Sequence, residues 1–282
     1  MNAEKSILVT GCSSGIGYGI AQKFIKEGYL VFGTVRKKKD ADRLQEELGE
    51  QFYPLIMDVT KPNTIKAAVT KVQKKLKGKG LGGLINNAGV ALSGPLLHMP
   101  MKEMRYMFEV NTFGPLEVTR AFLPLLGMRK NHDGRPGRII NISSNAGQIS
   151  APFIGAYCGS KHALEGMTNS LRQELKKYGI EILIVGPGFV NTSIVTNMSE
   201  ISRYEKTDYI QGLRTFTEMT RVQVVNEAHT IDEAGLLIYD IFHIKNPKTR
   251  YAVVKNKFKN RTLLMMMPIK IRDKLVAKIF GL

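Results

Sequence analysis

The sequence predicts an α/β protein: a single-domain, Rossmann-like, doubly wound parallel sheet with a C-terminal helical extension. Three observations support this prediction. Short β-branched runs alternate with amphipathic segments along most of the 282 residues, a glycine-rich turn follows the first run, and no internal repeat or low-complexity linker divides the chain. Strands and helices that alternate at this spacing give right-handed crossovers and a parallel sheet covered on both faces.

Each expected strand is a short run rich in Val, Ile and Leu, and each expected helix has an apolar face at helical spacing. The expected strands are 6–10, 30–35, 53–59, 81–86, 138–142 and 180–185. The expected helices are 16–27, 39–48, 61–76, 108–126 and 156–178.

The chain becomes irregular and polar from Asn191 to about Thr230. A long excursion after the last parallel strand is typical of a substrate loop. We therefore expect a lid at about 189–225 within a domain of residues 1–257, followed by a basic amphipathic extension at 258–282. The candidate wall residues of the lid are Phe189, Ile194, Met198, Tyr209, Phe216 and Met219.

The composition excludes several classes of protein. Charged residues make up 23% of the chain and glycine occurs 27 times, which is ordinary for a globular protein and unlike a disordered or collagen-like one. Cys12 and Cys158 cannot build a disulfide framework and lack zinc-site spacing, so we expect no metal and a reducing, cytoplasmic setting. The charged segment 1–5 leads straight into an apolar strand, so we expect no signal peptide, and no apolar run approaches the ~18 residues of a membrane span.

The first chemical motif is the segment 10–17, TGCSSGIG, between an expected strand and an expected helix. Glycines at this junction let the backbone turn tightly and approach a pyrophosphate, whose charge lies against the helix N-terminus. The same residues also suit a turn without a ligand. The expected contacts are Gly11, Ser13, Ser14, Gly15, Ile16 and Gly17.

Two further motifs follow. The segment 86–89, NNAG, ends the fourth expected strand, where Asn87, Ala88 and Gly89 would form an adenosine wall or a simple turn. Tyr157 and Lys161 lie four residues apart, on one face of a helix. An ammonium beside a phenol favours the phenolate and lowers its pKa from about 10, as a proton-transferring tyrosine requires.

The Tyr–Lys spacing alone is weak evidence, because Tyr251 and Lys255 repeat it in a Val-rich run near the C-terminus. Thirteen residues before Tyr157 stands Ser144, whereas Ile238 holds that place before Tyr251. We interpret the second copy as a solvated or strand pair.

Taken in order, these motifs with Asp58, Val59, Asn111, Pro187 and Gly188 resemble the short-chain dehydrogenase/reductase family over about residues 6–192. The resemblance implies a catalytic set of Asn111, Ser144, Tyr157 and Lys161. In it, Tyr157 exchanges a proton with the substrate oxygen, Ser144 orients that oxygen, and Asn111 positions a water beside Lys161. Lys161 also holds the nicotinamide ribose. The resemblance further implies cofactor contacts from Asp58, Val59, Pro187, Gly188, Val190 and Thr192.

The end of the second strand bears on cofactor choice. An acidic residue there would bind the ribose 2′-hydroxyl of NAD, but residues 34–39 read TVRKKK, with no acid before Asp40. Arg36 can hold a 2′-phosphate, so NADP(H) is predicted in preference to NAD(H). The glycine loop itself lacks a basic residue, unlike that of many NADP-using relatives.

The loop, the second strand and the extended C-terminus resemble the hydroxysteroid and retinol dehydrogenase-like branch of the family. This resemblance implies hydride transfer between NADP(H) and a lipophilic ketone, aldehyde or alcohol, in a homodimer or homotetramer. A 3-oxoacyl reductase acting on carrier- or CoA-bound substrates, and an inactive dinucleotide-sensing protein, are the alternatives.

Charge is concentrated at the C-terminus. The formal net charge is +17, and residues 245–282 contribute +10 of it, with Asp273 their one acid. From Ile271 the apolar residues 271, 275, 276 and 279 fall on one helical face. Such a helix suits an anionic membrane surface, a subunit interface or a cover for the substrate pocket. No module for nucleic acid accompanies it, so we expect no nucleic-acid partner.

Overall fold

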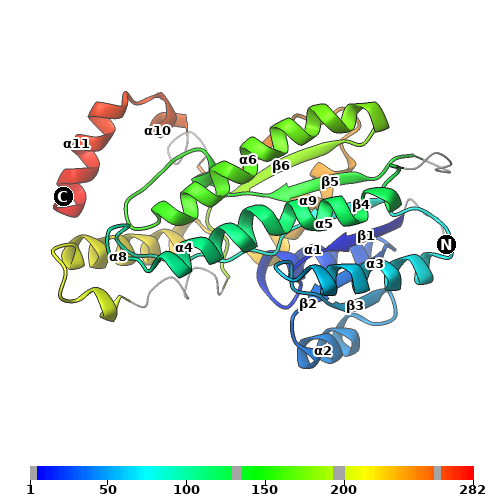
Figure 1. Ribbon diagram of the computed structural model, residues 1–282. Helices are drawn as coiled ribbons and strands as arrows, with labels where there is room; N and C mark the ends of the chain where they lie inside the picture. Colours follow the sequence, from blue (N-terminus) through cyan, green and yellow to red (C-terminus); the bar gives the residue numbers. More distant parts are fainter. Residues whose placement is uncertain (1–4, 129–134, 193–200, 257–261) are drawn as a thin grey trace.

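A seven-stranded parallel sheet in the order β3-β2-β1-β4-β5-β6-β7 forms the centre of the computed structural model (Figure 1). The model describes residues 5–128, 135–192, 201–256 and 262–282. The strand order reverses between β1 and β4, and the carboxyl ends of the strands there define the expected ligand crevice. The strands are β1 (Ser6–Val9), β2 (Leu30–Val35), β3 (Phe52–Ile56), β4 (Gly83–Asn86), β5 (Arg138–Ile142), β6 (Ile182–Pro187) and β7 (Arg250–Val253).

Helices cover both faces of the sheet, as the doubly wound prediction requires. One face carries α3 (Pro62–Leu76), α5 (Gly114–Phe122) and α6 (Gly155–Leu175). The other carries α1 (Gly15–Lys26), α2 (Lys38–Leu48) and α9 (Ile231–His243). The Rossmann-like fold class predicted from the sequence is confirmed.

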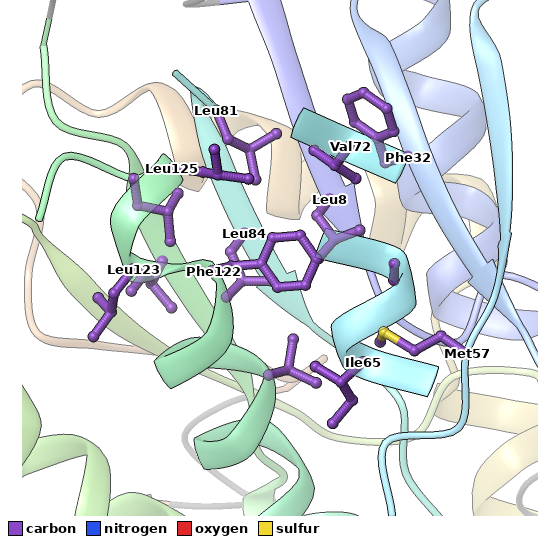
Figure 2. Packing of buried hydrophobic residues seen from close by; sticks show 14 of the residues in the cluster. Leu8, Phe32, Met57, Ile65, Val72, Leu81, Leu84, Phe122, Leu123 and Leu125 are labelled. Atoms are coloured by element: carbon purple, nitrogen blue, oxygen red, sulfur yellow. The ribbon is translucent and has the colours of Figure 1, made fainter. Parts of the chain in front are cut away.

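Each strand contributes to two cores because successive side chains point to opposite faces. In β1, Leu8 packs into the core under α3 and α5, while Ile7 and Val9 pack under α1 and α9. Figure 2 shows the first core, where the Phe122 ring of α5 lies among Leu8 and Leu84. All these side chains are fully buried.

The helix expected at 108–126 begins earlier than predicted and is interrupted. α4 (Met101–Phe108) runs into a π-helical turn at Glu109–Phe113, and α5 continues from it. The expected start was wrong by seven residues because only Met107 of α4 is buried, which leaves a weak apolar pattern.

The prediction that residues 191–230 are irregular was wrong in part, since α8 (Ile210–Glu227) is an 18-residue helix there. Only Gly212 and Leu213 of α8 are buried, and the helix contains three Thr and three Val, which have low helix propensity, so the sequence carries little helical signal. Ile194 and Met198 of the expected lid wall lie outside the described residues.

The excursion that contains α8 is closed at its base. Val190 forms a parallel bridge with His229, the His229 amide donates to the Phe189 carbonyl (2.9 Å), and the Asn191 amide donates to the His229 carbonyl (3.0 Å). The chain therefore leaves the sheet after β6 and returns to the same place before α9.

Two helices follow β7, namely α10 (Leu263–Met266) and α11 (Ile269–Phe280). α11 packs against α8, at the left of Figure 1, away from the body of the sheet. The predicted boundary at 257/258 falls outside the described residues. No helix in the described part of the chain is long and apolar enough to cross a bilayer.

Candidate active site

The glycine loop joins β1 to α1 at the strand-order reversal. Gly11 (φ +74°) and Gly15 (φ +61°) have left-handed backbone, which favours glycine. A Cβ added at Gly17 would overlap the Gly11 carbonyl oxygen and the Asn87 amide. The glycines therefore leave room at the N-terminus of α1 that larger side chains would occupy, and we call this space the cradle. It fits a dinucleotide pyrophosphate.

Cys12 and Thr34 fix the loop from below. The Cys12 amide donates to the Thr34 carbonyl (2.9 Å), and the Gly11 amide donates to the Thr34 hydroxyl (3.1 Å). Burial raises the pKa of the Cys12 thiol to about 12, against a smaller opposing effect of the Thr34 backbone. Cys12 is thus an anchor of the loop and no nucleophile.

Asn87 and Thr10 connect β4 to the loop. The Asn87 side-chain amide donates to the carbonyl oxygens of Thr10 (2.9 Å) and Gly11 (3.1 Å), while the Thr10 hydroxyl accepts from the amides of Asn87 and Ala88 (2.9 Å each). The Asn87 side chain is therefore committed to the loop, which leaves the backbone of this segment for the predicted adenosine contact.

Ser13, Ser14 and Ile16 occupy the rest of the loop. The Ser13 carbonyl accepts from the Arg43 guanidinium (2.7 Å), and Ser14 precedes α1 in extended conformation without a side-chain capping bond. Ile16 packs partly into the core under α1. The exposed Ser14 is free of that core, as a phosphate contact requires.

Arg36 and Asp58 lie at the carboxyl ends of neighbouring strands. Arg36 is exposed and contacts the Tyr106 hydroxyl (3.3 Å). Asp58 accepts from the amide (2.9 Å) and hydroxyl (2.8 Å) of Thr60. Burial raises the pKa of Asp58, but the Thr60 bonds and the charge of Arg36 outweigh it and lower that pKa overall. Val59, which follows Asp58, is buried.

The segment after β6 closes over the loop. The Gly188 amide donates to the Val253 carbonyl (2.8 Å), Pro187 ends β6, and Val190 is buried at the bridge with His229. A Cβ at Gly15 would lie 3.1 Å from the Thr192 methyl. Residues predicted to contact one cofactor are thus neighbours in space although about 180 positions separate them.

Tyr157 lies in the first turns of α6, and the apolar side chains of Met99, Met107 and Ala156 pack around it. Burial raises the pKa of Tyr157, opposed by a hydrogen bond with the Ser144 side chain. This is the reverse of the lowering expected from Lys161 alone. Tyr157 and Ser144 nevertheless meet, as the resemblance implies.

Lys161 is buried one turn further along α6. Its ammonium donates to the Ile142 carbonyl (2.9 Å) and lies 5.9 Å from the centroid of the Tyr157 ring. Burial lowers the pKa of Lys161 to about 8, against the opposing charge of Glu165. The ammonium is turned toward β5, which explains why burial dominates the pKa of Tyr157.

Asn111 sits in the π-helical turn and is fully buried. Its carboxamide pairs with both backbone groups of Val90 (2.8 Å each) and donates to the Ser160 hydroxyl (3.0 Å). A Cβ at Gly89 would lie 3.3 Å from the Asn111 oxygen and 3.6 Å from the Lys161 nitrogen, so Asn111 and Lys161 flank one glycine. π-helical turns are frequent at functional sites.

Sequence reasoning missed an ion pair behind the Ser144 loop. The Arg250 guanidinium, from β7, donates to both carboxylate oxygens of Glu165 (2.9 Å each) and to the Ser144 carbonyl (3.1 Å). Glu165 also accepts from the Ser143 hydroxyl (2.7 Å), and the side chains of the pair are 12% and 8% exposed. The sequence shows a Glu one turn after Lys161, but nothing in it pairs that Glu with residue 250.

The second Tyr–Lys pair takes no part in the site. Tyr251 lies in β7, where its hydroxyl accepts from the Lys248 amide (2.8 Å), and the Lys255 ammonium is 3.4 Å from the Glu233 carboxylate.

This fold and site define an NAD(P)-dependent oxidoreductase, and comparison with known proteins names its family. The family model described as short chain dehydrogenase matches residues 5–202, so the chain belongs to the short-chain dehydrogenase family. A solved short-chain dehydrogenase from Streptomyces avermitilis superposes with a TM-score of 0.76 at 26% identity, covering 98% of this chain and 95% of that one.

Two relatives illustrate the range of similarity. An NADPH-dependent 3-dehydrocapnine reductase of Ornithobacterium rhinotracheale is 37% identical over 96% of this chain and 95% of the relative. Estradiol 17-beta-dehydrogenase 2 of Mus musculus is 39% identical over 72% of this chain. The chain spans only 52% of that second relative's length. These similarities support the hydroxysteroid and retinol dehydrogenase-like branch predicted from the sequence.

Proposed function

We propose that the protein reduces a lipophilic ketone or aldehyde to its alcohol with NADPH. The observation that carries the proposal is the meeting of Tyr157 with Ser144 in an apolar environment one helical turn from Lys161. Bound NADPH supplies the hydride, and the residues of the chain supply position and the proton.

In this mechanism the Ser144 hydroxyl donates a hydrogen bond to the substrate oxygen and places it beside Tyr157. The Tyr157 hydroxyl gives its proton to that oxygen as negative charge develops there. Burial raises the pKa of Tyr157, so the side chain stays protonated at neutral pH. The protonated phenol is the form that reduction uses, and the reverse direction would start from the phenolate.

Arg36 supports the preference for NADP(H). It is exposed at the end of β2 and is followed by three Lys at 37–39, so its guanidinium is available to a 2′-phosphate. The similarity to an NADPH-dependent reductase over nearly the whole chain points the same way.

Apolar groups around Tyr157 support a lipophilic substrate. Met99, Met107 and Ala156 pack there, and a second cluster of Phe153, Tyr204 and Leu213 joins the catalytic segment to α8. We propose that residues 189–225 form the lid. The similarities to estradiol, retinol and 3-dehydrocapnine enzymes support this class of substrate over a carrier-bound acyl chain.

We further propose a homo-oligomer in a reducing, cytoplasmic setting. The two cysteines support the reducing setting, since both are free and buried. Light scattering after size exclusion gives the oligomeric state directly.

The test follows nicotinamide absorbance with NADPH or NADH and a panel of steroid ketones, retinal, long-chain ketones, acyl-CoA ketones and small aldehydes. We expect turnover with NADPH on one lipophilic class, and a loss of about 10²–10⁴ in kcat in Tyr157→Phe with NADPH affinity unchanged. Turnover that survives this substitution contradicts the mechanism. Tight NADPH binding without turnover favours the sensing alternative, and activity on acyl-CoA alone favours the 3-oxoacyl alternative.

A further inference from the structure

Helix α11 has one face that packs onto α8. The Phe280 ring lies 5.9 Å from Phe153 and 6.2 Å from Phe216, centroid to centroid. A Cβ at Gly212 would meet the Phe280 carbonyl oxygen, so α11 approaches α8 closely at this glycine. Arg272, Val276 and Phe280 are half-buried, which marks the inward face.

A second face of α11 is apolar and exposed. Ile271, Leu275 and Ile279 are 56%, 44% and 40% exposed. Residues four apart lie about 40° apart around an α-helix, so these side chains form one stripe. No neighbour within the described residues covers the stripe.

A row of lysines borders this apolar stripe. Lys270, Lys274 and Lys278 recur every four residues and are exposed. Lys278 lies about 20° from Ile271 around the helix, whereas Asp273 lies roughly opposite the centre of the stripe. Apolar side chains with lysines on their flank and the acid turned away are the arrangement of a helix that lies in a membrane interface.

The positive charge of the C-terminal segment favours an anionic membrane over a second copy of the chain as the partner of this surface. Residues 245–282 carry a net charge of +10, so a second copy of the chain would bring an equally basic segment against it. An anionic bilayer instead offers opposite charge to the lysine row and hydrocarbon to the stripe.

We propose that the outward face of α11, the Ile271–Leu275–Ile279 stripe with the Lys270–Lys274–Lys278 row, docks the protein onto an anionic phospholipid membrane. The inward face of the same helix packs on α8, so docking would hold the proposed lid one helix away from the bilayer. This inference requires no catalytic activity and stands apart from the proposed function.

Vesicle sedimentation of the full chain tests the proposal. The probes are phosphatidylcholine vesicles with and without phosphatidylglycerol. We expect binding to the anionic vesicles that weakens at high salt, and much less binding to the neutral ones. Replacing Lys270, Lys274 and Lys278 together by Gln should lower the partition coefficient roughly a hundredfold.

The matched control removes three exposed lysines from α3, Lys66, Lys71 and Lys74, also by Gln. It changes net charge equally and should lower binding by less than about threefold. A separate variant with Ile271, Leu275 and Ile279 replaced by Ser should lose at least about tenfold at unchanged melting temperature.

Three results would overturn the proposal: no binding to anionic vesicles, equal losses in the lysine variant and its α3 control, or undiminished binding in the serine variant. If the serine substitutions instead convert an oligomer to a smaller species while vesicle binding persists, the stripe is an interface between copies.

Discussion

The cofactor side and the substrate side of this molecule are built in opposite ways. On the cofactor side, backbone bonds, positive-φ glycines and the Asn87 amide fix the loop after β1 from several directions. On the substrate side, α8 contributes two buried residues. The excursion that contains α8 is held by an aromatic cluster, by the packing of α11 and by the ion pair of Arg203 with Glu103. The contrast fits the proposed roles, in which a firmly held loop binds the cofactor that the family shares and a loosely held excursion binds the particular substrate.

The largest expected effect tests the fixed side. In Gly17→Ala the new Cβ meets the Gly11 carbonyl and the Asn87 amide, neither of which can move without opening the loop. We expect NADPH affinity to fall by more than a hundredfold in isothermal titration.

Gly166→Ala is its matched control, because a Cβ at Gly166 of α6 meets nothing within 4 Å. Alanine in an exposed helix position should raise stability by about 0.5–1 kcal/mol and leave NADPH affinity unchanged. Equal affinity in the two variants would show that the loop does not form the cradle.

Substituting Arg250 tests whether the loop that carries Ser144 is held as firmly as the glycine loop after β1. Arg250→Lys keeps the charge but loses the planar fork on Glu165 and the bond to the Ser144 carbonyl. We expect kcat to fall about tenfold with NADPH affinity and KM nearly constant, as for a positioning residue. A change confined to melting temperature would instead assign the pair a purely structural role.

The pH dependence of the reaction tests the lowered pKa of the buried Lys161 ammonium. Burial lowers the pKa of Lys161 to about 8, so Lys161 loses its proton above that pH. We expect reduction to decline as pH rises through about 8. In Glu165→Gln the midpoint should move lower, because the Glu165 charge raises the pKa of Lys161.

Glu174→Gln, an exposed change on the same helix, should leave that midpoint in place.

The lowered pKa of Lys161 also affects the pH dependence of the free energy of unfolding. A lysine with a folded pKa below its unfolded value disfavours the folded state at low pH, so the free energy of unfolding should rise between about pH 8 and 10.5. A fall over that interval contradicts the assignment.

The smallest effect belongs to the lid. Arg203 donates to both carboxylate oxygens of Glu103 (2.6 and 2.7 Å) and so links the excursion to α4. A double-mutant cycle with Arg203→Gln and Glu103→Gln should give a coupling of about 0.5–1 kcal/mol for this partly exposed pair. We expect KM for the lipophilic substrate to change a few-fold and kcat to stay constant. A change in NADPH affinity instead would contradict the separation of the two sides.

The same contrast explains what the sequence could predict. Strands buried on both faces are continuous apolar runs in the sequence, so the strands could be predicted. The motifs of the cofactor side directly follow such runs, so these motifs could be predicted as well. α8 was missed because it packs through so few residues, and the Arg250–Glu165 pair because 85 positions separate its members. The pKa of Tyr157 also needed the structure, because burial raises it and the Lys161 ammonium donates to the Ile142 carbonyl instead of to the phenol.

The π-helical turn at Glu109–Phe113 makes the protein sensitive to one-residue deletions between α4 and α5. The turn holds one residue more than an α-helix would, and each residue turns a helix by about 100°. Deleting Thr112 or Phe113 would shorten the segment between Asn111 and Phe122 by one residue and so rotate Asn111 by about 100° relative to Phe122. A substitution along this helix changes one side chain. A change in its length by one residue would instead shift Asn111 of the predicted site relative to the core residues of α5.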